Sequence, residues 1–300
     1  MSLIGVLFKA MRPYQWVKNV LLFSGLIFSL SLFQTSSLLK SLMGFVVFCL
    51  ISSGIYLIND IRDFEEDRNH PVKKNRPIAS GKLKLPIARV FATILVIIAF
   101  VLSYFLNKGF TFLVAIYFLN NLAYSFGLKK VAILDVMMVS FGFLLRPVAG
   151  CVVIGVQVSP WLFICSLMFA LLFSFGKRRN ELSILKRSAN KHRKSLQDYT
   201  VYFLDIMMAI SGGLAIGTFA LYTMAAETVE RFGTQRLIIT TPFVLYGVFR
   251  YFFLVHLKSE GGDPTKLLTT DIPTLVNGAL FGLMLIYVIY GTKVFPIFHV

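Results

Sequence analysis

Charged residues are scarce in this chain, and their scarcity excludes several kinds of protein. Asp, Glu, Lys and Arg make up 15% of the 300 residues, whereas 57% are hydrophobic and the mean hydropathy is +0.75. A soluble domain is usually about a quarter charged, and disordered chains lack apolar residues. The composition therefore excludes a disordered chain. It also argues strongly against a soluble nucleic-acid-binding protein, despite a net charge of +16, so no nucleic-acid partner is expected.

Cysteine is also scarce. Cys49, Cys151 and Cys165 all lie within apolar runs and have no Cys-x-x-Cys spacing, so no disulfide framework is predicted and each is interpreted as a small core residue. The N-terminal segment has no short apolar core followed by a small-residue cleavage site, and no removable signal peptide is expected.

Long apolar runs, by contrast, recur along the whole sequence. A helix that crosses the ~30 Å hydrocarbon core of a bilayer needs about 20 apolar residues. The runs are continuous and do not alternate, which favours helices over strands. The predicted helices cover residues 17–34, 40–59, 86–106, 110–125, 131–154, 159–176, 202–224, 236–257 and 272–294. The fold class is therefore predicted as all-α, a polytopic membrane protein of about nine transmembrane helices that form a single transmembrane domain over residues 1–300.

The basic residues predict the orientation of these helices. Of the 30 Lys and Arg, 22 fall on one side of the predicted helices and five on the other. Cytoplasmic segments of membrane proteins carry the excess of basic residues. We therefore expect the N-terminus and the loops at about 60–85, 126–130, 177–201 and 258–271 to be cytoplasmic, and an odd helix count places the C-terminus outside.

Acidic residues are few, but several are concentrated at the end of the second predicted helix. Asp60, Asp63 and Asp67 have the spacing i, i+3, i+7, which places them on one face if that helix continues so far. Three like charges repel one another unless a divalent cation lies between them. Oxygen ligands without His favour Mg²⁺ over zinc, and Mg²⁺ commonly binds through one or two carboxylates plus substrate phosphates. The alternative is a solvated acidic helix end that pairs with the basic residues after it.

A basic segment punctuated by Pro and Gly, Asn75–Lys82, follows the acidic cluster. A metal on one side and Lys or Arg on the other would make a diphosphate-binding site. The motif Asn59-Asp60-x-x-Asp63-x-x-x-Asp67, followed by Arg76-Pro77-Ile78-Ala79-Ser80-Gly81, resembles the first aspartate-rich motif of the UbiA superfamily of membrane prenyltransferases. The predicted helix count agrees with this resemblance.

Further stretches resemble one branch of that superfamily, the decaprenyl-phosphate phosphoribosyltransferases, and the likeness covers nearly the whole chain. These stretches are Arg12–Asn19, Tyr124–Lys129, Gly176–Leu182, and Gly261–Thr265 together with Asp271. Typical superfamily members that use a prenyl diphosphate carry a second motif, Asp-x-x-x-Asp, after the sixth helix. This chain has Lys177, Arg178 and Glu181 there, with only Asp198 further on. One carboxylate among many cations suits an additional phosphate better than a second Mg²⁺, so the expected donor is phosphoribosyl diphosphate.

The resemblance implies a Mg²⁺-dependent transfer of a 5-phosphoribosyl group to a polyprenyl (decaprenyl-type) phosphate, with release of diphosphate, for cell-envelope glycolipid precursors. It implies a multi-pass protein of a bacterial-type inner (plasma) membrane with its active site on the cytoplasmic side. The residues expected to hold Mg²⁺ and act in catalysis are Asp60, Asp63 and Asp67. The residues expected to bind substrate are Asn59, Lys18, Lys73, Lys74, Arg76, Tyr124, Lys129, Lys177, Arg178 and Glu181.

Other charged residues have simpler expected roles. Lys186, Arg187, Lys191, Arg193 and Lys194 are expected at anionic lipid headgroups. Arg146 lies inside a predicted span, which is by default a functional-site hypothesis. Asp135 could be its partner, but eleven residues of helix separate the two by about 16 Å, so direct pairing is not expected. Asp135 itself either contacts substrate or caps its helix.

Two other functions stay open from the sequence. One is a UbiA-type polyprenyltransferase that acts on an aromatic acceptor, against which the missing second aspartate pair counts. The other is a polytopic transporter, but transporters place charged sites near the midplane and show repeated halves, whereas here the acidic residues lie at helix ends and no clear repeat is detected.

Overall fold

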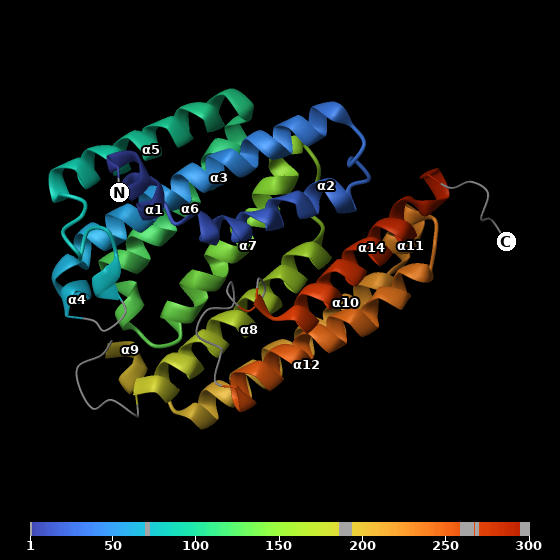
Figure 1. The fold of residues 1–300 in the computed structure, drawn as a ribbon. Helices are drawn as coiled ribbons and strands as arrows, with labels where there is room; N and C mark the ends of the chain where they lie inside the picture. Colours follow the sequence, from blue (N-terminus) through green and yellow to red (C-terminus); the bar gives the residue numbers. More distant parts are fainter. Residues whose placement is uncertain (1, 70–72, 186–193, 259–266, 268–269, 295–300) are drawn as a thin grey trace. The chain divides into compact units, whose positions relative to one another are not determined.

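The computed structural model describes residues 2–69, 73–185, 194–258, 267 and 270–294, and every regular element within these ranges is helical (Figure 1). The chain divides into two compact units. Unit 1 contains residues 1–26, 31–127 and 145–157, and unit 2 contains residues 27–30, 128–144 and 158–300. That residues 1–300 act as a single transmembrane domain stays a prediction.

Eight helical segments of the described residues are long and apolar enough to cross a membrane, which confirms an all-α multi-pass protein. They are α3 (Thr35–Arg62), α5 (Leu85–Leu106), α6 (Lys108–Phe126), α7 (Leu134–Ile154), α8 (Pro160–Leu185), α10 (Val201–Met224), η4 (Arg236–Thr240) with α12 (Thr241–Leu257), and α14 (Ile272–Val294).

The predicted helix at 17–34 takes a different form. Its residues belong to η1 (Pro13–Phe23), a 3₁₀ helix, and to the short α2 (Ser24–Phe28). Pro13 follows Arg12 in the left-handed region, and Leu30 also has a positive φ of 61°, so the backbone leaves the helical conformation at both ends of the segment. The fold still resembles a nine-helix arrangement whose first member is short and tightly wound.

Unit 1 is built around α3. This helix packs along α5 (Figure 1) and also contacts α6 and η1. Its buried side chains Val47, Phe48 and Ile51 form a core with Phe110 and Tyr117 of α6. A second cluster lies nearer the acidic end of α3 and contains Val6, Ala10, Leu57, Ile78, Leu83, Ala88, Ala92 and Leu95. The short helices α1 (Leu3–Ala10), α4 (Phe64–Arg68) and η2 (Lys73–Asn75) complete the unit at this end.

The second half of α7 belongs to unit 1 and approaches η1 at backbone distance. A Cβ atom added to Gly150 would lie 1.9 Å from the carbonyl oxygen of Leu22. A Cβ on Gly25 would likewise lie 2.7 Å from the backbone nitrogen of Cys151. Small residues allow such close approach between helices in membranes, where packing rather than the hydrophobic effect drives association. Gly150 is therefore required at this contact.

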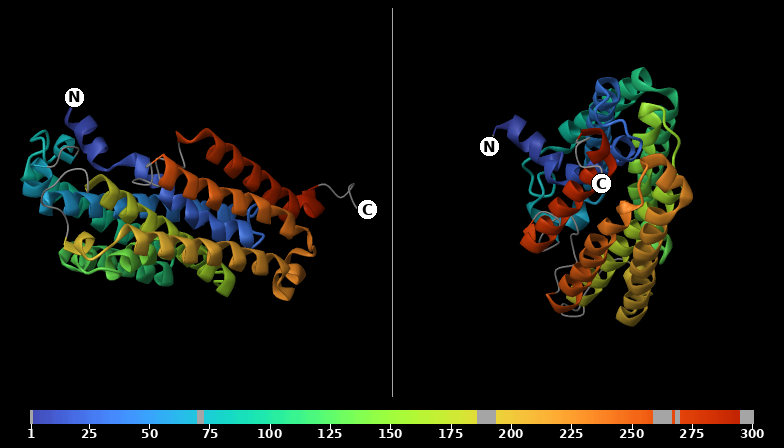
Figure 2. Two further views of the ribbon diagram at one scale, coloured as in Figure 1. Left: turned by 90° about the horizontal axis from the view of Figure 1, so that it is seen from below. Right: turned by 90° about the vertical axis from the view of Figure 1, so that its right-hand side faces the viewer.

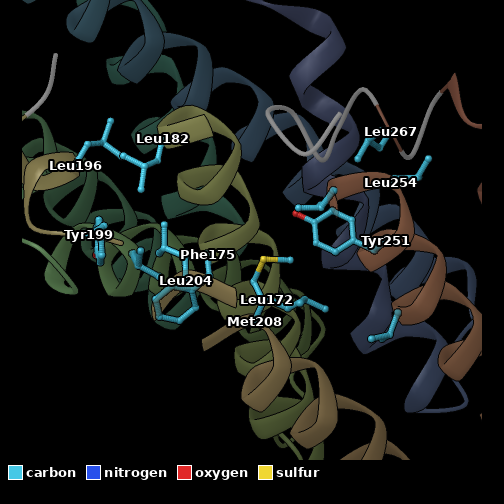
Figure 3. Packing of buried hydrophobic residues seen from close by; sticks show 13 residues of the cluster. Leu172, Phe175, Leu182, Leu196, Tyr199, Leu204, Met208, Tyr251, Leu254 and Leu267 are labelled. Carbon is cyan, nitrogen blue, oxygen red and sulfur yellow. The ribbon is translucent and has the colours of Figure 1, made fainter. Parts of the chain in front are cut away.

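Unit 2 is a series of long helices that lie side by side: α8 packs along α10, α10 along α12, and α12 along α14 (Figure 2). Its core includes Leu172 and Phe175 of α8, Leu204 of α10, and Tyr251 of α12, all labelled in Figure 3. The Tyr251 ring packs closely over Gly176 of α8, where an added Cβ would lie 2.2 Å from the tyrosine hydroxyl oxygen.

The start of α14 is fixed by Asp271. Its carboxylate accepts hydrogen bonds from the backbone nitrogen and the hydroxyl of Thr274, and Arg250 of α12 donates two more at 3.1 and 2.8 Å. These bonds, that of Arg250 above all, lower the pKa of Asp271 below its usual range. The carboxylate therefore stays charged and joins α12 to α14.

We predict that Gly150→Ala destabilises the protein, because the added methyl group would overlap the Leu22 carbonyl and the packed backbones cannot move apart freely. Overpacking of this kind costs about 1–3 kcal/mol, occasionally more. The measurement is the midpoint of thermal unfolding in detergent at one scan rate. Gly213→Ala is the matched control, because an added Cβ at Gly213 of α10 meets no atom within 4 Å. Equal midpoints for the two variants would contradict the close contact.

Candidate active site

The acidic end of α3 forms a corner at Asp63. Helix α3 ends at Arg62, and Asp63 has φ −87° and ψ 13° before α4 begins, so the condition under which the three aspartates would share one helical face is not met. The break is slight, because Asp63 N donates to Asn59 O at 2.9 Å and Asp67 N donates to Asp63 O at 2.8 Å. Both bonds have the i→i+4 spacing of an α-helix, which keeps the acidic residues close together.

Arg76 joins two of the three predicted metal ligands. Its Nη1 donates to Oδ1 of Asp60 at 2.9 Å and to Oδ2 of Asp67 at 2.6 Å. Both aspartates are buried, with 3% of each side chain exposed. A buried carboxylate is costly unless it is paired. Here one guanidinium group forms an ion pair with each of the two carboxylates. Lys73 lies on the same side, with its Nζ 4.0 Å from Oδ1 of Asp67.

Arg12 is a second cation at this cluster, which the sequence reasoning did not place among the site residues. It forms a salt bridge with Oδ1 of Asp60, and its guanidinium lies 5.1 Å from the centre of the Tyr56 ring. Burial on its own would lower the pKa of Arg12, but the Asp60 carboxylate outweighs burial and the pKa is raised. The available signal was its position at the start of the Arg12–Asn19 stretch.

The backbone around Arg12 is held firmly. Arg12 has φ 55° and ψ 60°, a left-handed conformation that costs a non-glycine residue about 1–2 kcal/mol. The Ser53 hydroxyl oxygen of α3 lies 3.0 Å from the Met11 carbonyl oxygen and accepts a hydrogen bond from Trp16 Nε1 at 3.1 Å. Residues before and after Arg12 are thus bound to α3 two turns before Asp60, which directs its side chain toward the acidic end.

The other predicted residues of unit 1 differ in how far their side chains are buried. The Ser125 hydroxyl of α6 donates to Oδ1 of Asn59 at 3.2 Å and so orients the amide. Asp63 at the corner and Tyr124, next to Ser125, are half-buried. Lys74 is exposed on η2, as is Lys73, and Lys18 is half-buried on η1. Among the residues predicted from the sequence, Asp60, Asp67, Arg76 and Lys73 take part in the ion pairs described above.

The cluster fits a magnesium ion bound together with a phosphorylated ligand. Within the part of the chain that the structure describes, no three His, Cys, Asp or Glu side chains are arranged to hold a metal on their own. Mg²⁺ requires fewer protein ligands, because it keeps several waters and binds through one or two carboxylates plus substrate phosphates. Asp60 and Asp67 supply two carboxylates on either side of one position, which a guanidinium nitrogen of Arg76 now fills. A cation already lies where the metal is expected.

In unit 2, the predicted loop at 177–201 begins later than expected. Helix α8 continues to Leu185, so Lys177, Arg178 and Glu181 are helical. The residues after Gly176 are good helix formers, and Arg178 Nη1 donates to Oε2 of Glu181 at 2.7 Å, an i, i+3 pair that stabilises a helix. Lys177 is exposed on this helix, and Glu181 is half-buried.

Arg178 is one of the most deeply buried side chains, with 2% exposed. Its Nε donates to Oδ2 of Asp135 at 2.6 Å, and Asp135 is fully buried at the start of α7. The sequence suggested substrate contact or a helix cap for Asp135, and the structure shows a further role for it. It is the counterion of Arg178.

The Asp135 carboxylate also accepts hydrogen bonds from two further side chains. The Tyr199 hydroxyl donates to Oδ1 of Asp135 at 2.8 Å, and the Ser195 hydroxyl lies 3.2 Å from Oδ2. Burial raises the pKa of Tyr199, and its hydrogen bond to Asp135 raises it further, so the hydroxyl remains a donor at neutral pH. The Ser195 hydroxyl also lies 3.1 Å from the carbonyl oxygen of Lys129, in η3 (Leu128–Lys130), which positions this half-buried lysine.

Arg146 is also buried, and its partners lie in unit 1. It donates to Oδ1 of Asn19 through Nε and to the Tyr117 hydroxyl through Nη2, both at 2.8 Å. Asp135 instead pairs with Arg178, in agreement with the expectation that it does not bind Arg146. Lys186, Arg187, Lys191 and Arg193 lie outside the described residues, as does the Gly261–Thr265 stretch.

Comparison with known proteins identifies relatives along nearly the whole chain. The sequence profile of the UbiA prenyltransferase family matches residues 20–272. A decaprenyl-phosphate phosphoribosyltransferase of Mycolicibacterium smegmatis is 36% identical over 230 residues, which are 75% of this chain and 72% of that protein. A protein of the same name from Corynebacterium glutamicum is 33% identical over 276 residues, 90% of this chain and 82% of its own.

The fold has a close counterpart among solved structures. A UbiA homologue from Archaeoglobus fulgidus bound to GPP and Mg²⁺ superposes with a TM-score of 0.73 and covers 95% of this chain and 99% of its own. The two sequences are 17% identical, so this likeness shows the fold alone.

We predict that Arg178→Met destabilises unit 2 far more than Lys177→Met. The first change leaves Asp135 buried without its cation, and breaking a buried pair in this way costs about 3–5 kcal/mol. The second change removes an exposed charge one residue away. Thermal unfolding midpoints in detergent test the prediction, and Asp135→Asn in the Arg178→Met background should recover part of the loss. Similar midpoints for the two single variants would show that the buried pair contributes nothing.

Proposed function

The chain belongs to the UbiA prenyltransferase family and is a multi-pass membrane transferase, and from this premise we propose that it transfers a 5-phosphoribosyl group from phosphoribosyl diphosphate to a polyprenyl phosphate. The product is a polyprenyl-phosphate-linked phosphoribose for cell-envelope glycolipid synthesis, made at the cytoplasmic side of a bacterial-type plasma membrane. The identity of 33–36% to the two curated phosphoribosyltransferases, over most of the chain, carries the proposal.

The reaction is a substitution at the anomeric carbon. The bond from C1 of the ribose to the diphosphate oxygen breaks, and its electron pair leaves with the diphosphate. An oxygen of the lipid phosphate forms the new bond to C1. This nucleophile is already an anion at neutral pH, so the protein needs no general base. Catalysis then depends on positioning and on stabilisation of the charge that develops on the leaving group.

In unit 1, Asp60 and Asp67 would hold Mg²⁺, with Asp63 and Asn59 in support. The bound metal supplies Lewis-acid chemistry, which neutralises the departing diphosphate. The buried setting of the two aspartates strengthens their attraction for a cation, because water screens it less. The Ser125 hydroxyl holds the Asn59 amide in one orientation. The residues of this unit that we assign to substrate binding are Lys18, Lys73, Lys74, Arg76 and Tyr124.

In unit 2, Lys129, Lys177 and Glu181 remain our candidates for substrate contact. Arg178 was predicted for the same role, but its guanidinium is buried against Asp135 and Glu181. We therefore assign Arg178 to positioning: it holds Glu181 and the adjacent turn of α8, and through Asp135 and Ser195 it is connected to the η3 backbone.

The direct test uses membranes that contain the protein, radiolabelled phosphoribosyl diphosphate and a polyprenyl phosphate. We expect labelled lipid when Mg²⁺ is present and none after chelation with EDTA. No labelled lipid, with label incorporated instead from a prenyl diphosphate into an aromatic acceptor, would overturn the proposal in favour of the first alternative. Solute flux into proteoliposomes without chemical turnover would favour a transporter.

We further predict that Asp67→Asn lowers transfer at least 100-fold, because it removes one of two carboxylates for the metal, and catalytic charge stabilisation of this kind contributes about 10²–10³ in rate. Higher Mg²⁺ concentrations should restore part of the rate. Glu66→Gln is the matched control: it also removes one negative charge from α4, but Glu66 is exposed. A 100-fold loss in both variants would mean that the net charge of α4 matters and not the buried carboxylate.

A further inference from the structure

Two of the three predicted metal ligands are already neutralised by arginines of the chain itself. Two buried carboxylates, Asp60 and Asp67, bind two guanidinium groups, those of Arg12 and Arg76. These four charges sum to zero, so the two guanidinium groups balance the two buried carboxylates before any ligand arrives. Arg76 contacts both carboxylates, whereas Arg12 contacts Asp60.

These ion pairs and a metal ion exclude one another. Mg²⁺ binds carboxylate oxygen at about 2.0–2.1 Å, and Arg76 Nη1 occupies the position between Oδ1 of Asp60 and Oδ2 of Asp67. A metal between these oxygens must displace that nitrogen, and the repulsion of two positive charges adds to the steric conflict. A displaced guanidinium then requires a new anion. The diphosphate that arrives with the metal offers oxygens in a geometry that arginine binds bidentately.

We propose that Arg12 and Arg76 are exchangeable counterions of this site. In the free protein they neutralise Asp60 and Asp67, and when Mg²⁺ and a diphosphate bind they move from the carboxylates to the diphosphate oxygens. The proposal rests on the proposed use of a diphosphate donor with Mg²⁺. It adds Arg12 to the substrate-binding residues and gives it two successive partners.

The structure around Arg12 suits such a move. The backbone is held on both sides, because Arg12 N donates to Lys9 O at 3.2 Å and Gln15 N donates to Arg12 O at 2.9 Å. The Ser53 contacts with Met11 and Trp16 fix the same segment to α3. The exchange therefore needs only side-chain rotation. The side chains of Arg12 and Arg76 are 16% and 24% exposed, so both reach from the buried carboxylates to the surface of the unit.

The exchange couples the two ligands. A metal ion alone must separate the arginines from their carboxylates, and a diphosphate alone meets two aspartates that still hold those arginines. Each ligand removes the obstacle to the other, so each should strengthen the binding of the other by the same factor. Removal of Arg12 should therefore have two opposite effects. The affinity for metal alone should rise, and the factor by which diphosphate increases that affinity should fall. A residue that only holds the fold together would not produce this pattern.

The experiment uses the purified full-length protein in detergent, with Mn²⁺ as a spectroscopic substitute for Mg²⁺ and inorganic diphosphate as the anion. Free Mn²⁺ is measured by electron paramagnetic resonance, with and without diphosphate. For the unaltered protein we expect diphosphate to tighten Mn²⁺ binding about 5- to 150-fold, the usual range for coupled sites. For Arg12→Gln we expect tighter Mn²⁺ binding alone and a coupling reduced at least fivefold.

Arg62→Gln is the matched control. It removes a positive charge from the end of α3, the helix that carries Asp60. The Arg62 guanidinium, however, lies over the Phe126 ring, 4.5 Å from its centre. Arg62→Gln should leave the coupling unchanged, and its effect on Mn²⁺ alone should be smaller than that of Arg12→Gln. Equal effects of the two variants would overturn the exchange, because they would arise from net charge. Weaker Mn²⁺ binding in Arg12→Gln would overturn it as well.

A second variant covers the case in which Arg12→Gln does not fold. Arg12→Lys keeps the charge opposite Asp60, and we expect reduced coupling because an ammonium lacks the bidentate geometry. Unchanged coupling in Arg12→Lys would overturn the proposal. The outcome is separate from the proposed function, since inorganic diphosphate carries no phosphoribosyl group. Coupling without phosphoribosyl transfer would refute the function alone, and transfer without coupling would refute the exchange alone.

Discussion

Buried charge is the constraint on which this structure depends. An unpaired charge in an apolar interior is costly, and the described residues meet this constraint with three arrangements. Arg12 and Arg76 neutralise the carboxylates at the end of α3, Asp135 neutralises Arg178, and Arg146 binds the neutral oxygens of Asn19 and Tyr117. Each arrangement joins different segments of the chain, so the contacts that compensate the buried charges also position η1, η2 and the end of α8.

The helical fold is largely predictable from the sequence, since long apolar runs define helices in a membrane protein. The predicted helix at 86–106 agrees with α5 to within one residue, and the one at 202–224 with α10. The predicted helix bounds are wrong where a polar segment is helical or where an apolar segment is not a single α-helix. Residues 177–185 are polar but helical, because Lys, Arg, Glu and Leu favour helix and Arg178 pairs with Glu181. Residues 17–28 are apolar but divide between a 3₁₀ helix and a short α-helix, a difference that hydropathy does not report.

The acidic half of the candidate site was predictable, but its basic half was only partly so. Asp60 and Asp67 lie close in sequence, and their spacing alone places them together. Arg12 lies 48 residues from Asp60, and Asp135 lies 43 residues from Arg178. Such pairings depend on how helices pack, which composition and spacing do not specify. The burial of Arg178 follows from the same packing, and it is the reason that we assign Arg178 to positioning and not to phosphate binding.

The backbone contacts that hold Arg12 against α3 also bear on how the chain is made. Synthesis proceeds from the N-terminus, so Arg12 leaves the ribosome long before Asp60. The counterion of this carboxylate is therefore present before α3 is complete, whereas Arg76, the partner of Asp67, follows its aspartate by nine residues. The N-terminal segment thus supplies, ahead of α3 in the order of synthesis, the charge that pairs with a buried carboxylate of that helix.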